Sequence, residues 1–152
     1  MLLSELLTSD RVKVPLVSRT KGDVLRELVE LVAKGRNGFD PEPVLAAVRE
    51  RELVLSTGIG AGIAIPHGKT PVVDQLMVAA GVAPDPIDFD ALDGRPVSLF
   101  FLLVGPESAS GAHVKVLSRI SRLLRRDPLR QALMRAPDAG AFLDVVRASE
   151  AA

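Results

Sequence analysis

The chain has 152 residues, 47% of them hydrophobic and 25% charged, which is the balance of a globular domain rather than of a disordered segment. Its 19 basic and 19 acidic residues give a formal net charge of zero, and it contains no Tyr or Trp, so we expect no nucleic acid among its partners. The absence of cysteine excludes disulfides, thiol catalysis and cysteine-based zinc sites, and it suits a reducing cytoplasm.

The first third of the chain predicts an edge strand and two helices. Residues 12–17 partly alternate between apolar and polar types, and their proline is compatible only with the edge of a sheet. Thr20 is a typical N-cap, and apolar residues then recur at helical spacing over 21–34, until the glycines and asparagine of 35–38 end the helix. A second helix is predicted to start at Asp40, with proline at its first helical position, and to end near Glu52.

The middle of the chain predicts two long strands separated by turns. Residues 75–82 and 97–104 are mostly apolar, and the second segment is almost wholly so, which predicts a central place in a sheet. Turn residues occupy 84–86 (Pro-Asp-Pro) and 92–94 (Leu-Asp-Gly) between them. The paired phenylalanines at 100–101 are better explained as sheet core than as ligand contacts.

The last third predicts three helices. Ser110 is expected to cap the first, and its inner face should carry four apolar residues: Val114, Leu117, Ile120 and Leu124. Asp127 should begin the second, and Asp138 should cap the third. Because helices interleave with strands, we expect an α/β fold with helices packed on a sheet, and residues 1–152 should form a single domain.

The sequence predicts neither a membrane-spanning segment nor a signal peptide. The longest apolar stretch, 97–104, is far too short to span a bilayer. The first residues carry an acid and no basic region, unlike a signal peptide. We therefore expect a cytoplasmic protein that is not embedded in a membrane.

The segment 56–70 is a glycine-rich loop that holds one of only two histidines, with a brief strand expected at 63–65. Alternate glycines permit a positive φ and close approach of the backbone. Pro66 stiffens the chain before His67, and Gly68 should leave that histidine without a bulky neighbour. His67 is either an ordinary surface histidine or one presented on a rigid, open backbone.

Two nucleotide-binding motifs fail on spacing in this loop. Residues 68–70 (Gly-Lys-Thr) match the end of a Walker A motif, but the position of its first glycine falls on Ile63. The glycines of 58–62 give Gly-x-Gly-x-Gly instead of the dinucleotide fingerprint Gly-x-Gly-x-x-Gly, and no strand precedes them. We therefore expect no bound nucleotide.

The second histidine, His113, falls at the predicted start of the helix capped by Ser110. There backbone N–H groups and the helix dipole favour an anion, and a neutral imidazole can add a hydrogen-bond donor. The alternative is a surface histidine near a cap. A metal site at the two histidines lacks a convincing third ligand, since Glu107 qualifies by sequence distance only.

Basic residues recur along the outer face of the same predicted helix: Lys115, Arg119, Arg122 and Arg126. Such a stripe suits an acidic partner, nucleic acid or simple solvation. The zero net charge favours solvation.

The motif that begins Arg51-Glu52 and continues through 56–69 (Ser-Thr-Gly-Ile-Gly-Ala-Gly-Ile-Ala-Ile-Pro-His-Gly-Lys) resembles the phosphorylation site of type-2 enzyme IIA domains. These domains belong to the bacterial phosphoenolpyruvate-dependent sugar phosphotransferase system (PTS), in its mannitol/fructose and nitrogen-regulatory branches. The resemblance extends to 111–117 (Gly-Ala-His-Val-Lys-Val-Leu), which is similar to the family's second-histidine helix.

The resemblance implies a mixed, mostly parallel β-sheet flanked by helices on both faces. It implies that His67 accepts phosphate from the carrier protein HPr or a nitrogen-branch counterpart and hands it to a IIB domain. It further implies that His113 assists and that Arg51 lies near the site, where its guanidinium suits phosphate oxygens. Ser56 and Thr57 have hydroxyls for phosphate or for ordinary turn bonds. Because phosphoryl transfer needs mainly positioning and charge stabilisation, no cofactor or metal is expected.

The resemblance leaves three functions open. The chain feeds a fructose- or mannitol-type permease, or it is a regulatory IIA protein whose phosphorylation state controls its binding to partner proteins. The third is a degenerate interaction domain without catalysis, which the presence of His67, His113 and Arg51 disfavours.

Overall fold

The computed structural model describes residues 2–34 and 38–151. Within these residues, six strands form one sheet in the order β1-β5-β6-β3-β2, and β4 also pairs with β6. The strands are β1 (Val12–Lys13), β2 (Gly58–Gly60), β3 (Ile63–Ala64), β4 (His67–Lys69), β5 (Met77–Ile87) and β6 (Val97–Gly105). Three of the five pairings are parallel (β1–β5, β3–β6 and β4–β6) and two are antiparallel. This is the mixed, mostly parallel sheet that was expected.

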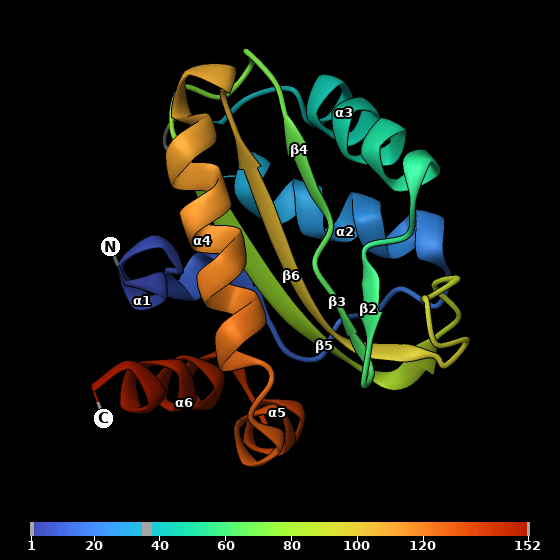
Figure 1. Cartoon of the computed structure of the whole chain (residues 1–152), viewed down its shortest axis with the longest axis vertical. Coiled ribbons are helices and arrows are strands. Elements are labelled where there is room, and N and C mark those ends of the chain that lie inside the picture. The colour runs from blue at the N-terminus through green and yellow to red at the C-terminus, as the bar shows by residue number, and fades with distance from the viewer. Residues whose placement is uncertain (1, 35–37, 152) are drawn as a thin grey trace.

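Helices cover both faces of the sheet (Figure 1). The helices are α1 (Leu3–Leu6), α2 (Lys21–Ala33), α3 (Pro41–Val54), α4 (Ser110–Leu123), α5 (Asp127–Met134) and α6 (Ala139–Ala151). One hydrophobic cluster joins α2 and α3 to one face of the sheet, and a second joins α1, α4, α5 and α6 to the other. The central strand β6 serves both clusters, because Phe100 lies in the first and Phe101 in the second.

The N-terminal elements follow their local signals. The Thr20 hydroxyl accepts a hydrogen bond from the Asp23 N–H (3.2 Å), so the predicted N-cap is confirmed. The second helix begins with proline as predicted, and the Asp40 carboxylate caps it by accepting from the Glu42 N–H (3.0 Å). The strand expected over 12–17 is only two residues long and lies at the sheet edge. The helix stop expected at Gly35 and Asn37 lies outside the described residues.

One predicted turn is wrong. Residues 84–86 (Pro-Asp-Pro) lie within β5, which continues to Ile87. The pairing with β6 is interrupted by a register shift between Val82 and Ile87, so the missing proline N–H groups break no regular ladder bond. The turn at 92–94 is confirmed, because the Gly94 N–H donates to the Ala91 carbonyl (2.9 Å) and Gly94 has a φ of 74°.

Helix α4 is phased differently from the sequence prediction. Ser110 is its first helical residue rather than its cap, and its hydroxyl donates to the Glu107 carbonyl (2.6 Å). The buried face is formed by His113, Val116 and Ile120, whereas Val114 is 62% exposed. The packed stripe therefore lies one residue earlier than expected at the start of the helix, and it places His113 against the sheet.

The glycine-rich segment 56–70 contains three short strands, and β3 confirms the brief strand expected at 63–65. Gly60 and Gly62 have φ values of 103° and 79°, and with Ala61 they make the turn between β2 and β3. Gly68 was expected to leave space beside His67, but in the structure it leaves space for α3. A Cβ there would lie 3.1 Å from the Val48 N and 3.2 Å from the Ala47 carbonyl carbon, so the glycine lets α3 pack its backbone directly on β4.

We predict that Gly68→Val lowers the free energy of unfolding by about 1–3 kcal/mol, because the added side chain must displace the backbone of α3. Urea denaturation measures the change. Gly22→Ala is the matched control, because Gly22 lies in α2 with no heavy atom within 4 Å of an added Cβ. A Gly68→Val protein as stable as this control would contradict the proposed packing of α3.

Candidate active site

Strand β4 places His67 beside the central strand, with His67 opposite Leu103 of β6 in parallel register. Successive side chains of a strand point to opposite faces. Gly68 faces α3, so His67 and Lys69 face the other side, which α4 covers (Figure 1). The histidine is partly buried and is the first residue of a short strand that pairs with the central strand β6.

One hydrogen bond fixes the tautomer of His67. Its Nδ1 lies 2.9 Å from the carbonyl oxygen of Ile65. Because a carbonyl oxygen can only accept, Nδ1 carries the hydrogen, and in the neutral ring Nε2 holds the lone pair. Neighbouring bonds hold this carbonyl in place: the Ile65 N–H donates to the Thr57 carbonyl (3.0 Å), and the next carbonyl, of Pro66, accepts from the Leu103 N–H (3.0 Å).

The structure brings His113 into contact with His67. Their ring centroids are 5.7 Å apart, and the rings meet edge to face at 66°. His113 is only 3% exposed, so it is a buried residue of the site and not a surface histidine near a cap. Within the described residues its Nδ1 is buried without a hydrogen-bond partner. A buried polar atom left unpaired in this way is costly unless a ligand or solvent meets it.

Both rings are held in the neutral form. Burial lowers the pKa of His67 below its ordinary value, and the positive charges of Arg51 and Lys69 act in the same direction, against the Ile65 hydrogen bond and the charge of Glu52. Burial lowers the pKa of His113 to about 4, with His67 and Lys69 adding to the effect. A neutral imidazole is the form that has a nucleophilic nitrogen.

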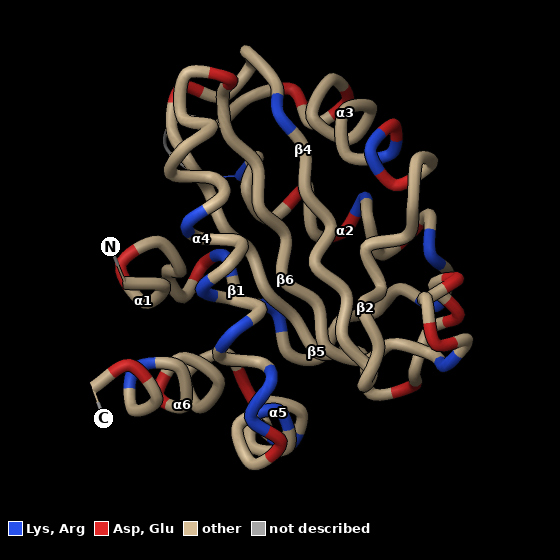
Figure 2. The backbone as a smooth tube through the Cα atoms, viewed as in Figure 1, with Lys and Arg blue, Asp and Glu red and all other residues tan. Residues whose placement is uncertain are grey.

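Two cations lie near His67. Arg51 and Lys69 both lie within electrostatic reach of His67, and Figure 2 shows basic positions on both α3 and β4. The Arg51 guanidinium donates to the Leu55 carbonyl at the end of α3 (2.8 Å), which fixes its position. The three residues expected at the site therefore do gather there. Lys69 is the last residue of the motif, and no role at the site was predicted for it, although its position two residues after His67 on a strand indicates a shared face.

The other polar candidates have structural partners. The Ser56 hydroxyl donates to the Phe89 carbonyl (3.1 Å), and the Thr57 hydroxyl donates to Glu52 (2.6 Å). In the parts of the chain that the structure describes, no three His, Asp or Glu side chains are arranged to hold a metal ion, so Glu107 completes no such group.

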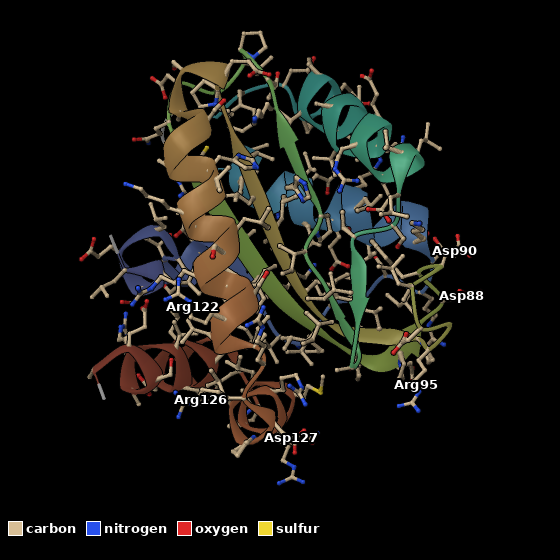
Figure 3. All side chains as sticks on the ribbon, viewed as in Figure 1. Asp88, Asp90, Arg95, Arg122, Arg126 and Asp127 are labelled. Carbon is tan, nitrogen blue, oxygen red and sulfur yellow. The ribbon has the colours of Figure 1, made fainter. Side chains whose placement is uncertain are left out.

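The basic stripe of α4 lies along a different part of the molecule. Arg119 forms an ion pair with the buried Glu150 of α6 (2.7 Å). Figure 3 shows Arg122 on the α6 side of α4. Arg126, which was expected on the same helix face, lies beyond the end of α4 as the N-cap residue of α5. The stripe is thus partly structural, and it is not part of the histidine site.

Comparison with known proteins assigns this arrangement to a family. The family model described as "Phosphoenolpyruvate-dependent sugar phosphotransferase system, EIIA 2" matches residues 5–149. The chain belongs to this family. Its members are IIA domains involved in phosphoryl transfer. No helix in the described residues is long and apolar enough to span a membrane.

Relatives come from two branches of this family. The "PTS system fructose-specific EIIABC component" of Bacillus subtilis is 38% identical over 146 residues, which cover 96% of this chain and 23% of that protein. The chain thus spans less than a quarter of that relative. The "Nitrogen regulatory protein" of Bradyrhizobium diazoefficiens is 35% identical over 146 residues, covering 96% of this chain and 95% of that protein.

Solved structures show the same fold. The nitrogen regulatory protein IIA-Ntr from Neisseria meningitidis superposes with a TM-score of 0.87 at 31% identity, covering 95% of this chain and 98% of that one. The mannitol enzyme IIA of Escherichia coli, solved in complex with phosphorylated enzyme IIB, gives a TM-score of 0.79 at 19% identity over 94% of this chain and 99% of that one. At that identity the second match shows the fold alone.

We predict that His113 makes folding pH-dependent. The unfolded chain binds a proton at this residue below its ordinary pKa of 6.5, whereas the native state resists protonation until about 4. Its contribution to stability is therefore complete above about pH 6.5 and is lost as the pH falls towards 4. From about pH 7.5 to about pH 5, wild type should lose about 2 kcal/mol more unfolding free energy than His113→Gln, which cannot titrate.

Urea titrations of both proteins at the two pH values measure this difference, because groups that do not interact with His113 change alike in both. Equal losses in wild type and variant would mean that His113 is not held neutral by the fold.

Proposed function

We propose that residues 1–152 act as a single IIA domain and carry a phosphoryl group on Nε2 of His67. In this proposal an HPr-type phosphocarrier protein donates the group in the cytoplasm, and a IIB domain of a fructose- or mannitol-type permease receives it. The observation that carries the proposal is the Nδ1–H bond to the Ile65 carbonyl, which directs the lone pair of a neutral ring to Nε2.

The proposed transfer needs no net movement of a proton within this chain. The lone pair on Nε2 attacks phosphorus, a P–N bond to His67 forms, and the bond between phosphorus and the donor atom breaks with its electron pair returning to the donor. The His67 ring becomes an imidazolium that keeps its Nδ1–H, and the Ile65 carbonyl oxygen accepts from it throughout. Transfer to the acceptor reverses these changes, so one geometry serves both directions.

The residues around His67 can stabilise the negative charge of the transferred phosphoryl group. The phosphoryl oxygens carry negative charge in the loose transition state, and catalysis consists mainly of positioning and neutralising them. Lys69 lies on the same strand face as His67, and Arg51 adds a second cation. In this proposal His113 donates a ring N–H to a phosphoryl oxygen and excludes water from one side of the group, since it is buried, neutral and in contact with His67.

The proposed acceptor follows from a relative with the same fold. The mannitol enzyme IIA of Escherichia coli is known in a complex with phosphorylated enzyme IIB. We extend that kind of partnership to this chain, because the same fold presents His67 at the end of a strand, where a second protein can reach it.

A second candidate is a nitrogen-regulatory IIA function, in which phosphorylation of His67 changes binding to regulated proteins. The favouring observation is the match to IIA-Ntr of Neisseria meningitidis, at a TM-score of 0.87 and 31% identity over nearly the whole of both chains. The chemistry at His67 is the same in both candidates. They differ in whether the phosphoryl group must move on to a IIB domain.

The proposal is tested by incubating the protein with phosphoenolpyruvate, enzyme I and HPr and measuring acid-labile phosphate. Wild type should take up one phosphate per chain and pass it to an added fructose- or mannitol-type IIB domain, whereas His67→Ala should take up none. Labelling of wild type without transfer to IIB would favour the regulatory candidate. Labelling of His67→Ala, but not of His113→Ala, would show that the two histidines have the opposite roles.

We predict that Lys69→Gln slows phosphorylation of His67 by on the order of 10-fold, which corresponds to a loss of about 1.4 kcal/mol of charge stabilisation in the transition state. Initial rates at saturating phospho-HPr measure the effect. Lys115→Gln, which removes an exposed charge from α4, is the control and should react like wild type. Equal rates in the two variants would exclude a role for Lys69.

A further inference from the structure

A buried carboxylate near His67 has no role in the mechanism above. Glu52 lies in the last turns of α3, and only 7% of it is exposed. Three donor groups converge on its two oxygens: the Thr57 N–H (3.0 and 3.1 Å), the Thr57 hydroxyl (2.6 Å) and the ammonium group of Lys21 (3.0 Å). Burying a carboxylate is costly, so a fully paired one ties the surrounding chain to a single geometry.

Two further hydrogen bonds connect Thr57, which Glu52 holds, to the His67 ring. The carbonyl of Thr57 accepts from the Ile65 N–H (3.0 Å), and the carbonyl of Ile65 accepts from Nδ1 of His67 (2.9 Å). The first bond joins two neighbouring segments and the second is local to residues 65–67, so the position of the Ile65 carbonyl depends on where Thr57 is fixed.

We propose that Glu52 is a positioning residue for phosphoryl transfer: through Thr57 and Ile65 it fixes the tautomer and direction of the His67 ring. This inference rests on the proposed function of His67. The negative charge of Glu52 also acts on His67, favouring the positively charged ring and opposing the effects of Arg51 and Lys69. Phosphorylation creates that positively charged ring, so Glu52 favours phosphorylation of His67 in two ways: it orients the ring, and its charge stabilises the ring that results.

Glu52→Gln should disturb this arrangement with little change in shape. A side-chain amide offers one acceptor oxygen where the carboxylate offers two, and it brings an NH2 group towards donors that already converge there. Thr57 must then shift, and Ile65 with it. Hydrogen bonds weaken steeply as they bend or lengthen, so the Nδ1–H tautomer of His67 should lose its preference.

The chain contains a matched control. Glu27 of α2 is 8% exposed and is held by the same kinds of group. It accepts from the backbone N–H groups of Val17 and Ser18, from the Ser18 hydroxyl (2.6 Å) and from Lys13 (2.7 Å). Glu27→Gln should therefore cost stability in a comparable way, but its partners lie at 13–18, and in the described residues none of them is hydrogen-bonded to Ile65 or His67 as Thr57 is to Ile65.

The experiment compares wild type, Glu52→Gln and Glu27→Gln by two measurements. Nitrogen-15 NMR of the imidazole ring reports which nitrogen of His67 is protonated, in the folded protein and without any partner. Initial rates of labelling by phospho-HPr report transfer. Glu52→Gln should show a mixture of tautomers and labelling slower by on the order of 10-fold or more, because small displacements of a nucleophile are costly. Glu27→Gln should resemble wild type in both.

A milder pair of variants applies if Glu52→Gln does not fold. Thr57→Val removes the hydroxyl donor but keeps the backbone N–H, and Ser18→Ala is its counterpart at Glu27. The same contrast between the two sites is expected, with a smaller effect.

The outcomes separate this inference from the proposed function. If wild type is labelled and the Glu52 and Glu27 variants behave alike, the positioning role is wrong and the carrier function stands. If wild type is not labelled, the carrier function is wrong, and the tautomer measurement alone decides whether Glu52 orients the ring. A wild-type ring protonated at Nε2 would overturn the inference outright.

Discussion

The hydrogen bond between Nδ1 of His67 and the Ile65 carbonyl is the constraint on which the site depends. A free neutral imidazole exchanges its proton between two nitrogens and rotates, so its lone pair is on Nε2 only part of the time and has no fixed direction. Here the acceptor is a backbone carbonyl, which cannot donate in return. The Ile65 N–H is bonded to Thr57, just before β2, and the Pro66 carbonyl is bonded to Leu103 of β6. The sheet therefore determines the chemistry of a side chain that lies at its surface.

The layered architecture meets a second requirement of the site: the two histidines must be shielded from water, and charged residues must lie near His67. Helix α4 lays His113 against the face of the sheet that carries His67, and burial keeps both rings neutral. On the opposite face, Gly68 lets α3 approach β4 at backbone distance. That close approach brings the end of α3, with Arg51 and Glu52, near a histidine that faces away from it.

Local signals identified most elements, and the errors occurred where packing overrides them. The caps at Thr20 and Asp40 are short-range hydrogen bonds, so composition predicts them well. The prolines of 84–86 are turn formers by composition, yet they lie in β5 because the ladder is interrupted at that point. The predicted buried face of α4 was wrong by one residue at its start. Helical spacing allows either His113 or Val114 to face the sheet, and packing on the sheet buries His113.

The sequence by itself determined the family, the α/β class and the pair of histidines, because these depend on residue identity and on spacing along the chain. Only the tertiary structure showed that Gly60 and Gly62 shape the turn between β2 and β3, while His67 is held by the Ile65 carbonyl. The link from Glu52 to His67 is equally invisible in the sequence. It passes through hydrogen bonds between segments, and such bonds form only when the sheet brings distant backbone groups within about 3 Å of one another.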